Sequence, residues 1–244
     1  MKWTEKHTVS TLETDMAETV TVSAILRLFQ NTANLQCKNI RPSNEELRER
    51  GYAFVVSRMN LSIYKPLFAY DGIEVSTWAC ESRGAAFNRC FEIKRDGMKV
   101  AEAASVWALL DIGSKRICRV ADFTEGYLAG DFEPMVELDS PKRIKIPESA
   151  RLALDGEYRV SYRDADLNGH MNNTVYADFL CGFLPMEGKR VSTFSICYQS
   201  EAPLGCELKI YVGADADEEG KYYLRTVKDD GRTNVEAEIM LESI

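Results

Sequence analysis

Two stretches of the chain place apolar residues at helical spacing. In the second half of the sequence they recur at i, i+3, i+4 and i+7, as Tyr176, Phe179, Leu180 and Phe183. This spacing predicts a helix with one apolar face that begins near Asn173 and ends at Pro185, with Asn172 or Asn173 as its cap. In the first half, a helix with the same kind of face is predicted by Val22, Ile25, Leu26, Phe29 and Ala33.

Segments with the alternation of β-strands follow both predicted helices. Residues 73–78 and 207–212 alternate between apolar and polar side chains. Asp-Gly pairs at 96–97 and 230–231, which are 134 residues apart, stand between β-rich segments and predict hairpin turns. The segment 61–67 is also echoed by 194–204, with about four extra residues in the second copy. A helix followed by antiparallel strands is therefore predicted twice.

This repeat predicts an α+β architecture with two domains. We expect an N-terminal domain at 1–125 and a C-terminal domain at 157–244, each an antiparallel sheet wrapped around a central helix. Between them, residues 126–156 are predicted to be a connector, because the strand pattern is interrupted by Gly126, Gly130, Pro134, Pro141 and Pro147. Each half alone would leave a sheet edge exposed, so we expect the two sheets to pair side by side.

The composition is that of a globular chain. Of its 244 residues, 45% are hydrophobic and 28% are charged, and no run approaches the roughly 18 apolar residues of a membrane helix. Residues 1–7 lead into no apolar signal core, so we expect a cytoplasmic protein that does not bind membranes. The net charge of −8 disfavours nucleic-acid binding, which needs a basic face.

Cysteine and histidine usage bears on redox state and metal binding. The seven cysteines include no Cys-x-x-Cys pair, and the chain has two histidines. We therefore expect reduced, mostly buried thiols and no structural zinc site. No metal or cofactor is predicted.

The candidate chemistry lies in residues 166–176. This run combines a carboxylate, an amide and a histidine, as Asp166, Asn168 and His170, just before the second predicted helix. Unpaired N–H groups at a helix start polarise a carbonyl oxygen, so the grouping suits acyl transfer. On the residues alone, turn and cap roles for the Asp and Asn side chains, and a buried structural role for His170, remain alternatives.

The complete pattern is Asp-x-Asn-x-His-x-Asn-Asn-x-x-Tyr, preceded by Tyr162-Arg163-Asp164. It resembles the second half of the acyl-acyl-carrier-protein (acyl-ACP) thioesterases of the hot-dog superfamily, in which a long sheet wraps around one helix. The resemblance implies a tandem (double) hot-dog fold. It also implies that the catalytic residues are Asp166, Asn168, His170 and Glu201, and we expect the substrate to be bound by Asn172, Asn173 and Tyr176.

The sequence departs from the family at the position after the glutamate. The family has a cysteine there, whereas this chain has Ala202. A cysteine nucleophile at that position is therefore excluded, and we do not expect Cys197 or Cys206 to replace it.

The first half lacks the candidate chemistry. Residues 14–21, the counterpart of 166–176, contain no histidine and no Asn-Asn pair, and His7 lies well before them, on the opening strand or in the terminus. We therefore predict one active site per chain, in the second half. The first half is expected to supply walls of the acyl pocket.

The resemblance implies hydrolysis of fatty acyl-ACP thioesters to free fatty acid and ACP, without a cofactor. We expect the carbonyl oxygen to be held by N–H groups near Asn172 and Asn173, with help from the Asn168 amide. Either carboxylate, Glu201 or Asp166, would activate water or attack directly. Our hypothesis is that Glu201 and His170 handle the water while Asp166 fixes His170 or Asn168.

The net charge does not decide whether ACP is the partner of this chain, so alternative functions stay open. ACP is acidic, so docking it on a chain of net charge −8 requires a local basic patch, and candidates are residues 142–145, the group Arg41, Arg48 and Arg50, and residues 115–119. The alternatives are an acyl-CoA thioesterase, a non-catalytic acyl-binding module and a hydro-lyase on the same fold. Either a monomer or a homodimer fits the sequence.

Overall fold

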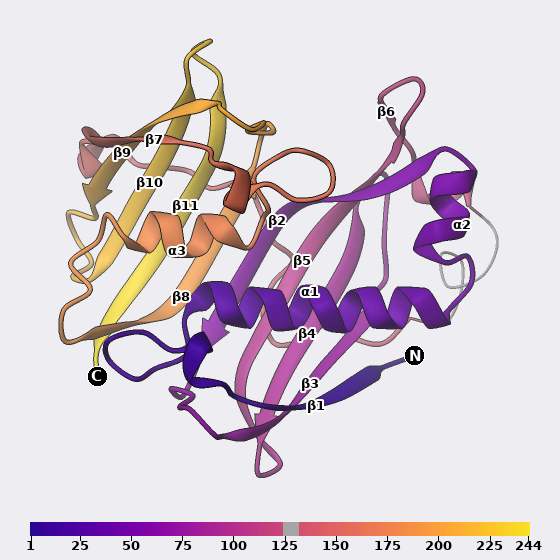
Figure 1. Ribbon diagram of the computed structural model, residues 1–244, viewed down its shortest axis with the longest axis horizontal. Helices are drawn as coiled ribbons and strands as arrows, with labels where there is room; N and C mark the ends of the chain where they lie inside the picture. Colours follow the sequence, from indigo (N-terminus) through magenta and orange to yellow (C-terminus); the bar gives the residue numbers. More distant parts are fainter. Residues whose placement is uncertain (124–131) are drawn as a thin grey trace.

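The computed structural model describes residues 1–123 and 132–244 (Figure 1). In the first half the elements are β1 (Trp3–Thr8), η1 (Thr11–Glu13), α1 (Val22–Asn39), α2 (Asn44–Glu49), β2 (Tyr52–Ile63), β3 (Gly72–Ala79), β4 (Phe87–Arg95), β5 (Met98–Asp111), β6 (Arg116–Ile117) and η2 (Val120–Asp122). In the second half they are η4 (Glu148–Ala150), β7 (Ala153–Arg159), η5 (Tyr162–Asp164), α3 (Val175–Cys181), β8 (Lys189–Tyr198), β9 (Glu207–Ala214), β10 (Lys221–Lys228) and β11 (Thr233–Ser243).

All of these strands belong to one sheet. Its order is β1-β3-β4-β5-β2-β8-β11-β10-β9-β7, with β6 attached to β5. The two halves meet where β2 and β8 pair antiparallel, from Arg58 opposite Cys197 to Ser62 opposite Thr193. The predicted pairing of the two sheets is therefore confirmed, and it makes them continuous.

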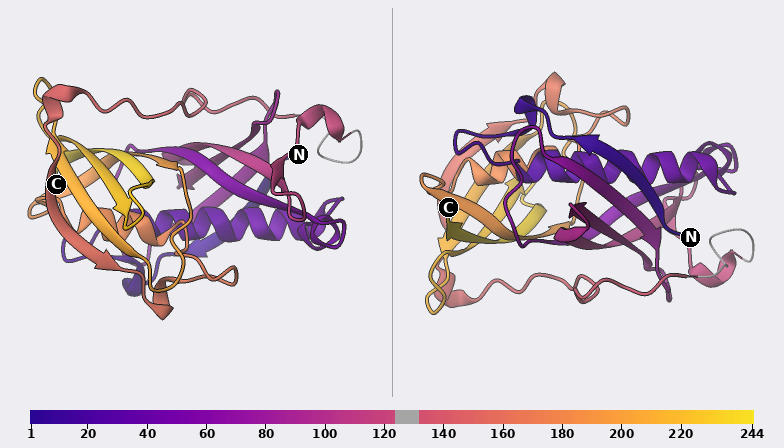
Figure 2. Two further views of the ribbon diagram at one scale, coloured as in Figure 1. Left: turned by 90° about the horizontal axis from the view of Figure 1, so that it is seen from above. Right: turned by 90° about the horizontal axis from the view of Figure 1, so that it is seen from below.

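The two central helices lie on one face of this sheet (Figures 1 and 2). Arg27 of α1 and Asp178 of α3 form an ion pair of 3.5 Å between the halves. Apolar side chains from both halves form one core cluster, which includes Phe29 of α1 and Leu180 of α3, each with 0% exposure. Burial on this scale stabilises by roughly 1.5–3 kcal/mol for each large apolar side chain.

Helix α1 follows the sequence pattern closely. Thr21 caps it, since its hydroxyl oxygen accepts a hydrogen bond of 3.1 Å from the N–H of Ala24. The predicted apolar face points to the sheet, and Phe29 stacks on Phe91 of β4 with ring centroids 4.7 Å apart. The helix ends at Asn39.

Helix α3 is shorter than the spacing predicts. It begins at Val175 rather than Asn173 and ends at Cys181 rather than Pro185, and its N-cap is Thr174 rather than Asn172 or Asn173. The Asn172 side chain accepts hydrogen bonds from the Thr174 N–H and hydroxyl at 2.9 and 2.8 Å. This local turn keeps the chain out of the helix for two more residues.

Residues 132–147, between the halves, run in extended form over the face of the sheet that the helices leave open (Figure 2). Trp78 donates a hydrogen bond of 2.8 Å to the carbonyl of Pro134, and Met135, Val136 and Leu138 pack against the cluster around Trp78. Residues 126–131 of the predicted connector lie outside the described residues. Strand β7 begins at Ala153, inside the stretch predicted to be connector.

Backbone hydrogen bonds define how the two halves correspond. The N–H groups of Tyr64 and Lys65 both donate to the carbonyl of Val100, at 2.8 and 3.2 Å. The N–H groups of Gln199 and Ser200 both donate to the carbonyl of Asn234, at 2.9 and 3.1 Å. The copies therefore match residue for residue here, and the predicted insertion of about four residues is wrong.

Among the described helices, none combines the length and the apolar character needed to cross a bilayer.

The seam between the halves yields a prediction about stability. Phe194 of β8 lies opposite Leu61 of β2 and has 0% exposure. Phe194→Ala is expected to lower the free energy of unfolding by about 3–5 kcal/mol, because it removes a buried ring and leaves a cavity. Urea denaturation measures this, with Thr193→Ala, the exposed neighbour on the other face of the strand, as control. Equal effects of the two substitutions would contradict the packing described here.

Candidate active site

The loop that carries the candidate residues rests on a buried carboxylate. Asp164 is 3% exposed and accepts hydrogen bonds from the Ser161 N–H (2.8 Å), the Ser161 hydroxyl (2.6 Å) and the Tyr158 hydroxyl (2.7 Å). Burial raises the pKa of Asp164, but these hydrogen bonds outweigh burial and hold the pKa below its ordinary value. Asp164 therefore anchors the base of the loop as a carboxylate.

Asp166 shapes the turn above this anchor. Its carboxylate accepts the Asn168 N–H at 2.8 Å and the Asn168 side-chain amide at 3.3 Å. Its own N–H donates to the carbonyl of His170 at 2.9 Å, and Gly169 takes the positive φ of 76° that closes the turn. The structure thus brings Asp166 to Asn168, which was one of the two partners that we expected.

His170 and Glu201 meet across the sequence. His170 Nε2 lies 3.3 Å from Glu201 Oε2, and the two side chains are 33% and 66% exposed. Water therefore reaches both groups. An imidazole beside a carboxylate at this distance is able to accept and release protons as a pair.

Backbone pairing sets this distance. The stretches 169–171 and 202–204 are joined by hydrogen bonds from Met171 N–H to the carbonyl of Ala202 (2.8 Å) and from Leu204 N–H to the carbonyl of Gly169 (3.1 Å). His170 consequently lies opposite Pro203 in a short antiparallel bridge. Glu201 directly precedes that bridge, so its side chain reaches the imidazole.

The two asparagines do not provide the pair of N–H groups that we expected for a carbonyl oxygen. The Asn172 N–H donates to the carbonyl of Asp164 at 2.8 Å, so it is already used by the loop. The Asn173 N–H donates no hydrogen bond to any described residue. Of the two predicted donors, Asn173 is the one that remains.

Tyr176 lies beneath the site. It is 2% exposed, and its ring packs edge-on against Tyr198 with centroids 5.7 Å apart. Burial raises the pKa of its hydroxyl, and a hydrogen bond with Asn234 offsets part of the rise. The expected contact between Tyr176 and substrate stays a prediction, and it requires the acyl chain to enter the core beside this ring. Tyr198 donates a hydrogen bond of 2.9 Å to the carbonyl of Asn173 and so holds the end of the loop.

The neighbouring thiols are poorly suited to act as nucleophiles. Cys197 is buried and its Sγ contacts the carbonyl of Lys142 at 3.5 Å, while the Sγ of Cys206 contacts the carbonyl of Glu207 at 3.6 Å. Burial raises the pKa of both thiols, which disfavours the reactive thiolate. Within the described residues, no cluster of three or more His, Cys, Asp or Glu side chains is arranged to hold a metal ion.

The first half contains the same loop without the chemistry. Asp15 N–H donates to the carbonyl of Thr19 at 2.9 Å, as Asp166 does to His170, and Val20 N–H donates to Leu67 at 2.9 Å, as Met171 does to Ala202. Thr19 therefore occupies the position of His170, and Pro66 occupies that of Glu201. Neither residue is an acid or a base, and one active site per chain stays a prediction.

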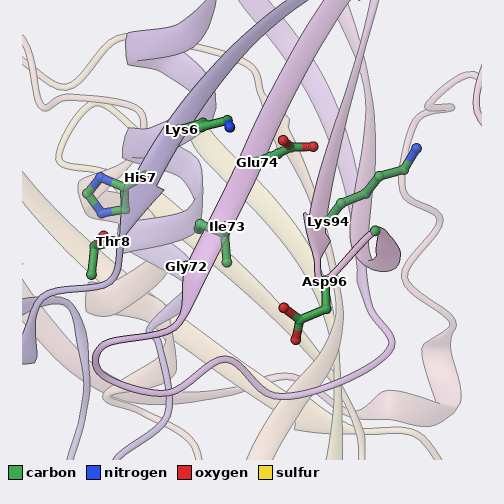
Figure 3. Close-up of a pocket in the computed structure, with 9 residues that line it drawn as sticks. Lys6, His7, Thr8, Gly72, Ile73, Glu74, Lys94 and Asp96 are labelled. Carbon is green, nitrogen blue, oxygen red and sulfur yellow. The ribbon is translucent and has the colours of Figure 1, made fainter.

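His7 belongs to the framework of the first half. It lies on β1, which confirms one of the two predicted placements, the opening strand. It borders an open hollow formed with β3 and the turn at Asp96 (Figure 3). Its Nε2 lies 2.9 Å from Glu13, whose carboxylate also accepts the N–H of Ser10. Tyr158 and Asp164 make the same kind of contact in the second half, so His7 anchors a turn.

Two basic residues near the site were not assigned to it from the sequence. Arg48 of α2 contacts Asn168, with 3.5 Å between Nη2 and Oδ1, so the first half touches the loop of the second. Lys228 of β10 is 8% exposed and donates a hydrogen bond of 3.2 Å to the carbonyl of Glu201. Sequence spacing gives no signal for either contact, since both partners lie on distant elements.

Comparison with known proteins places the chain in a family. Residues 1–127 match the model of the acyl-ACP thioesterase N-terminal domain, and residues 148–243 match that of the C-terminal domain. The chain belongs to the acyl-ACP thioesterase family. The resemblance noted in the motif is thereby confirmed.

Curated acyl-ACP thioesterases are similar to this chain, with low sequence identity. A chloroplastic acyl-(acyl-carrier-protein) hydrolase of Cuphea viscosissima is 23% identical over 88% of this chain and 56% of its own length. The chloroplastic oleoyl-acyl carrier protein thioesterase 2 of Arabidopsis thaliana is 27% identical over 75% of this chain and 54% of its own length. The chain thus spans about half the length of these relatives.

Solved structures of the family share the fold. An acyl-ACP thioesterase from Bacteroides thetaiotaomicron superposes with a TM-score of 0.86 at 22% identity, covering 99% of this chain and 98% of that one. A 12:0-ACP thioesterase from Umbellularia californica gives 0.85 at 16% identity, covering 100% and 98%. The predicted double hot-dog fold is therefore confirmed.

The Asp164 anchor yields a prediction about pH. A carboxyl whose pKa is lowered by folding stabilises the protein above its ordinary pKa of about 3.9, and this contribution disappears as the pH falls through the lower, folded value. Asp164→Asn is therefore expected to destabilise the protein at pH 7, and the destabilisation is expected to shrink as the pH falls below about 3.9. Urea denaturation across this range tests it, with the exposed Asp139→Asn as control. A penalty that does not change with pH would contradict the assignment.

Proposed function

We propose that the chain hydrolyses fatty acyl-ACP thioesters to free fatty acid and ACP. The observation that supports this most directly is the pair formed by His170 and Glu201, 3.3 Å apart and open to water, on a loop that matches the family pattern. Membership of the acyl-ACP thioesterase family supports the substrate class.

The proposed reaction begins with attack of water on the thioester carbonyl. Glu201 accepts a proton from the water as its oxygen bonds to the carbonyl carbon. When the tetrahedral intermediate collapses, the C–S bond breaks and protonated His170 gives a proton to the leaving thiolate. The products are the fatty acid and the free thiol of the carrier. The choice of Glu201 over Asp166 is supported by the hydrogen bonds that commit Asp166 to Asn168.

The developing negative charge on the carbonyl oxygen needs donors. In this proposal they are the Asn173 N–H and the side-chain amide of Asn168, which is exposed on the same loop. Losing one such donor typically costs about 10²–10³ in rate. Asp166 keeps Asn168 in place and is assigned the role of positioning it.

The first half is proposed to wall the acyl chain, while the second half carries the chemistry. Support comes from the core cluster shared between the halves and from the contact of Arg48 with Asn168. Arg48 also provides positive charge beside the site, where an acidic carrier would arrive. Of the basic groups considered in the sequence, residues 142–145 lie on the chain between the halves, across the sheet from the helices (Figure 2).

Substitution of the paired residues tests the proposal. His170→Ala and Glu201→Gln are each expected to lower kcat for acyl-ACP by at least about 10²-fold, the usual contribution of a general acid or base. Free-thiol release from acyl-ACP of several chain lengths measures this. The matched control is Thr19→Ala, the same position of the first half, for which wild-type turnover is expected.

Comparing acyl-ACP with acyl-CoA as substrates distinguishes the proposed function from the alternatives. Faster release from acyl-CoA than from acyl-ACP would assign the chain to the acyl-CoA thioesterases. Binding of acyl chains without turnover by the wild-type protein would leave a binding module. Full activity of Glu201→Gln would contradict the proposed roles.

A further inference from the structure

The second half buries an amide side chain close to the candidate site. Asn234, on β11, is 0% exposed. A buried amide is costly unless it is hydrogen-bonded. Its Nδ2 donates to the carbonyl of Ser200, and its Oδ1 accepts a hydrogen bond of 3.0 Å from the hydroxyl of Thr226, which is also 0% exposed. Both ends of the amide are therefore oriented by fixed partners, and the amide also interacts with the buried hydroxyl of Tyr176.

The carbonyl that Asn234 binds belongs to Ser200, the residue directly before Glu201. The main chain of Asn234 also accepts hydrogen bonds from Gln199 and Ser200, and Lys228 donates to the carbonyl of Glu201 at 3.2 Å. Residues 199–201 are thus tied to β10 and β11 on one side, while residues 202–204 pair with the stretch that carries His170. The position of the Glu201 carboxylate depends on these ties.

The first half shows that the fold itself does not need the amide. Val100 holds the same backbone position there, because Tyr64 and Lys65 donate to its carbonyl as Gln199 and Ser200 donate to that of Asn234. Val100 is 1% exposed and apolar, and Pro66 stands where the second half has Glu201. The buried amide occurs in the half that has the carboxylate.

We propose that Asn234 is a positioning residue for the candidate site, holding the strand end through its side chain so that Glu201 faces His170. The inference rests on the proposed function. Asn234 acts through Glu201 and is not expected to touch substrate.

The first test is Asn234→Val, which installs the residue of the equivalent first-half position. A displaced catalytic group commonly costs about 10²-fold, so we expect kcat for acyl-ACP to fall by roughly 10–100-fold while KM changes by less than about threefold. Asn234→Val removes the acceptor of the Thr226 hydroxyl proton, while the Thr226 oxygen still accepts the N–H of Val235 at 3.1 Å. If Asn234→Val folds poorly, Asn234→Leu, which is closer in volume to the amide, is expected to show the same loss of kcat.

A double-mutant cycle with Glu201→Gln separates positioning from general destabilisation. If Asn234 acts through Glu201, Asn234→Val changes the residual rate of Glu201→Gln by less than about twofold. Equal factors in both backgrounds would overturn the proposal, as would an unchanged kcat in the wild-type background. Thermal unfolding confirms that each variant is folded at the assay temperature.

A matched control lies on the same two strands. Ser192 of β8 is 6% exposed, and its hydroxyl contacts the carbonyl of Met240 on β11 at 3.5 Å, toward the far end of the strands from Glu201. Ser192→Ala is expected to keep wild-type kcat. Absence of thioester hydrolysis by the wild-type chain would refute the proposed function. Hydrolysis with additive effects in the cycle would refute only the role of Asn234.

Discussion

A short antiparallel bridge between residues 169–171 and 202–204 holds the candidate site together. It joins a loop that precedes α3 to the segment that follows β8, and it places His170 opposite Pro203. The imidazole and the Glu201 carboxylate are 31 residues apart in sequence and 3.3 Å apart in space as a result. Asp164 supports this bridge from below through the loop, while Asn234 and Lys228 support it through the strand end.

The duplicated fold separates what belongs to the architecture from the chemistry proposed for the second half. Both halves form the same turn, the same bridge and the same strand end, so these features belong to the architecture. In the first half the equivalent positions hold Thr19 and Pro66, which cannot exchange protons in the physiological range. The pairing of β2 with β8 places the first half directly beside the second half. Because the first half has no acid-base pair at the equivalent positions, its side chains can instead line the surroundings of the candidate site.

The sequence predicted the parts of the structure that depend on local pattern. The apolar face of α1 follows from its spacing because the sheet buries that face. Helix α3 was predicted too long, since spacing does not register the turn that Asn172 makes with Thr174. The predicted alignment of 61–67 with 194–204 was also wrong, because residues of the same type in the two copies have different backbone hydrogen-bond partners.

A motif, and not hydrophobic spacing alone, predicts the candidate site. Asp166, Asn168 and His170 are close in sequence, and Glu201 was assigned by resemblance to the family. The roles of Asn234 and Lys228 cannot be predicted from the sequence, because their hydrogen-bond partners, the carbonyls of Ser200 and Glu201, lie on another element of the fold. Tyr176 stands in the motif, yet burial places it beneath the loop.

A crystal structure with a non-hydrolysable acyl-pantetheine analogue tests the proposed site most directly. The group replacing the thioester carbonyl is expected to lie within hydrogen-bonding reach of the loop at 168–173 and beside the pair His170 and Glu201, with the acyl chain directed toward the first half. An analogue whose reacting centre lies at Thr19 and Pro66, or away from both loops, would contradict it.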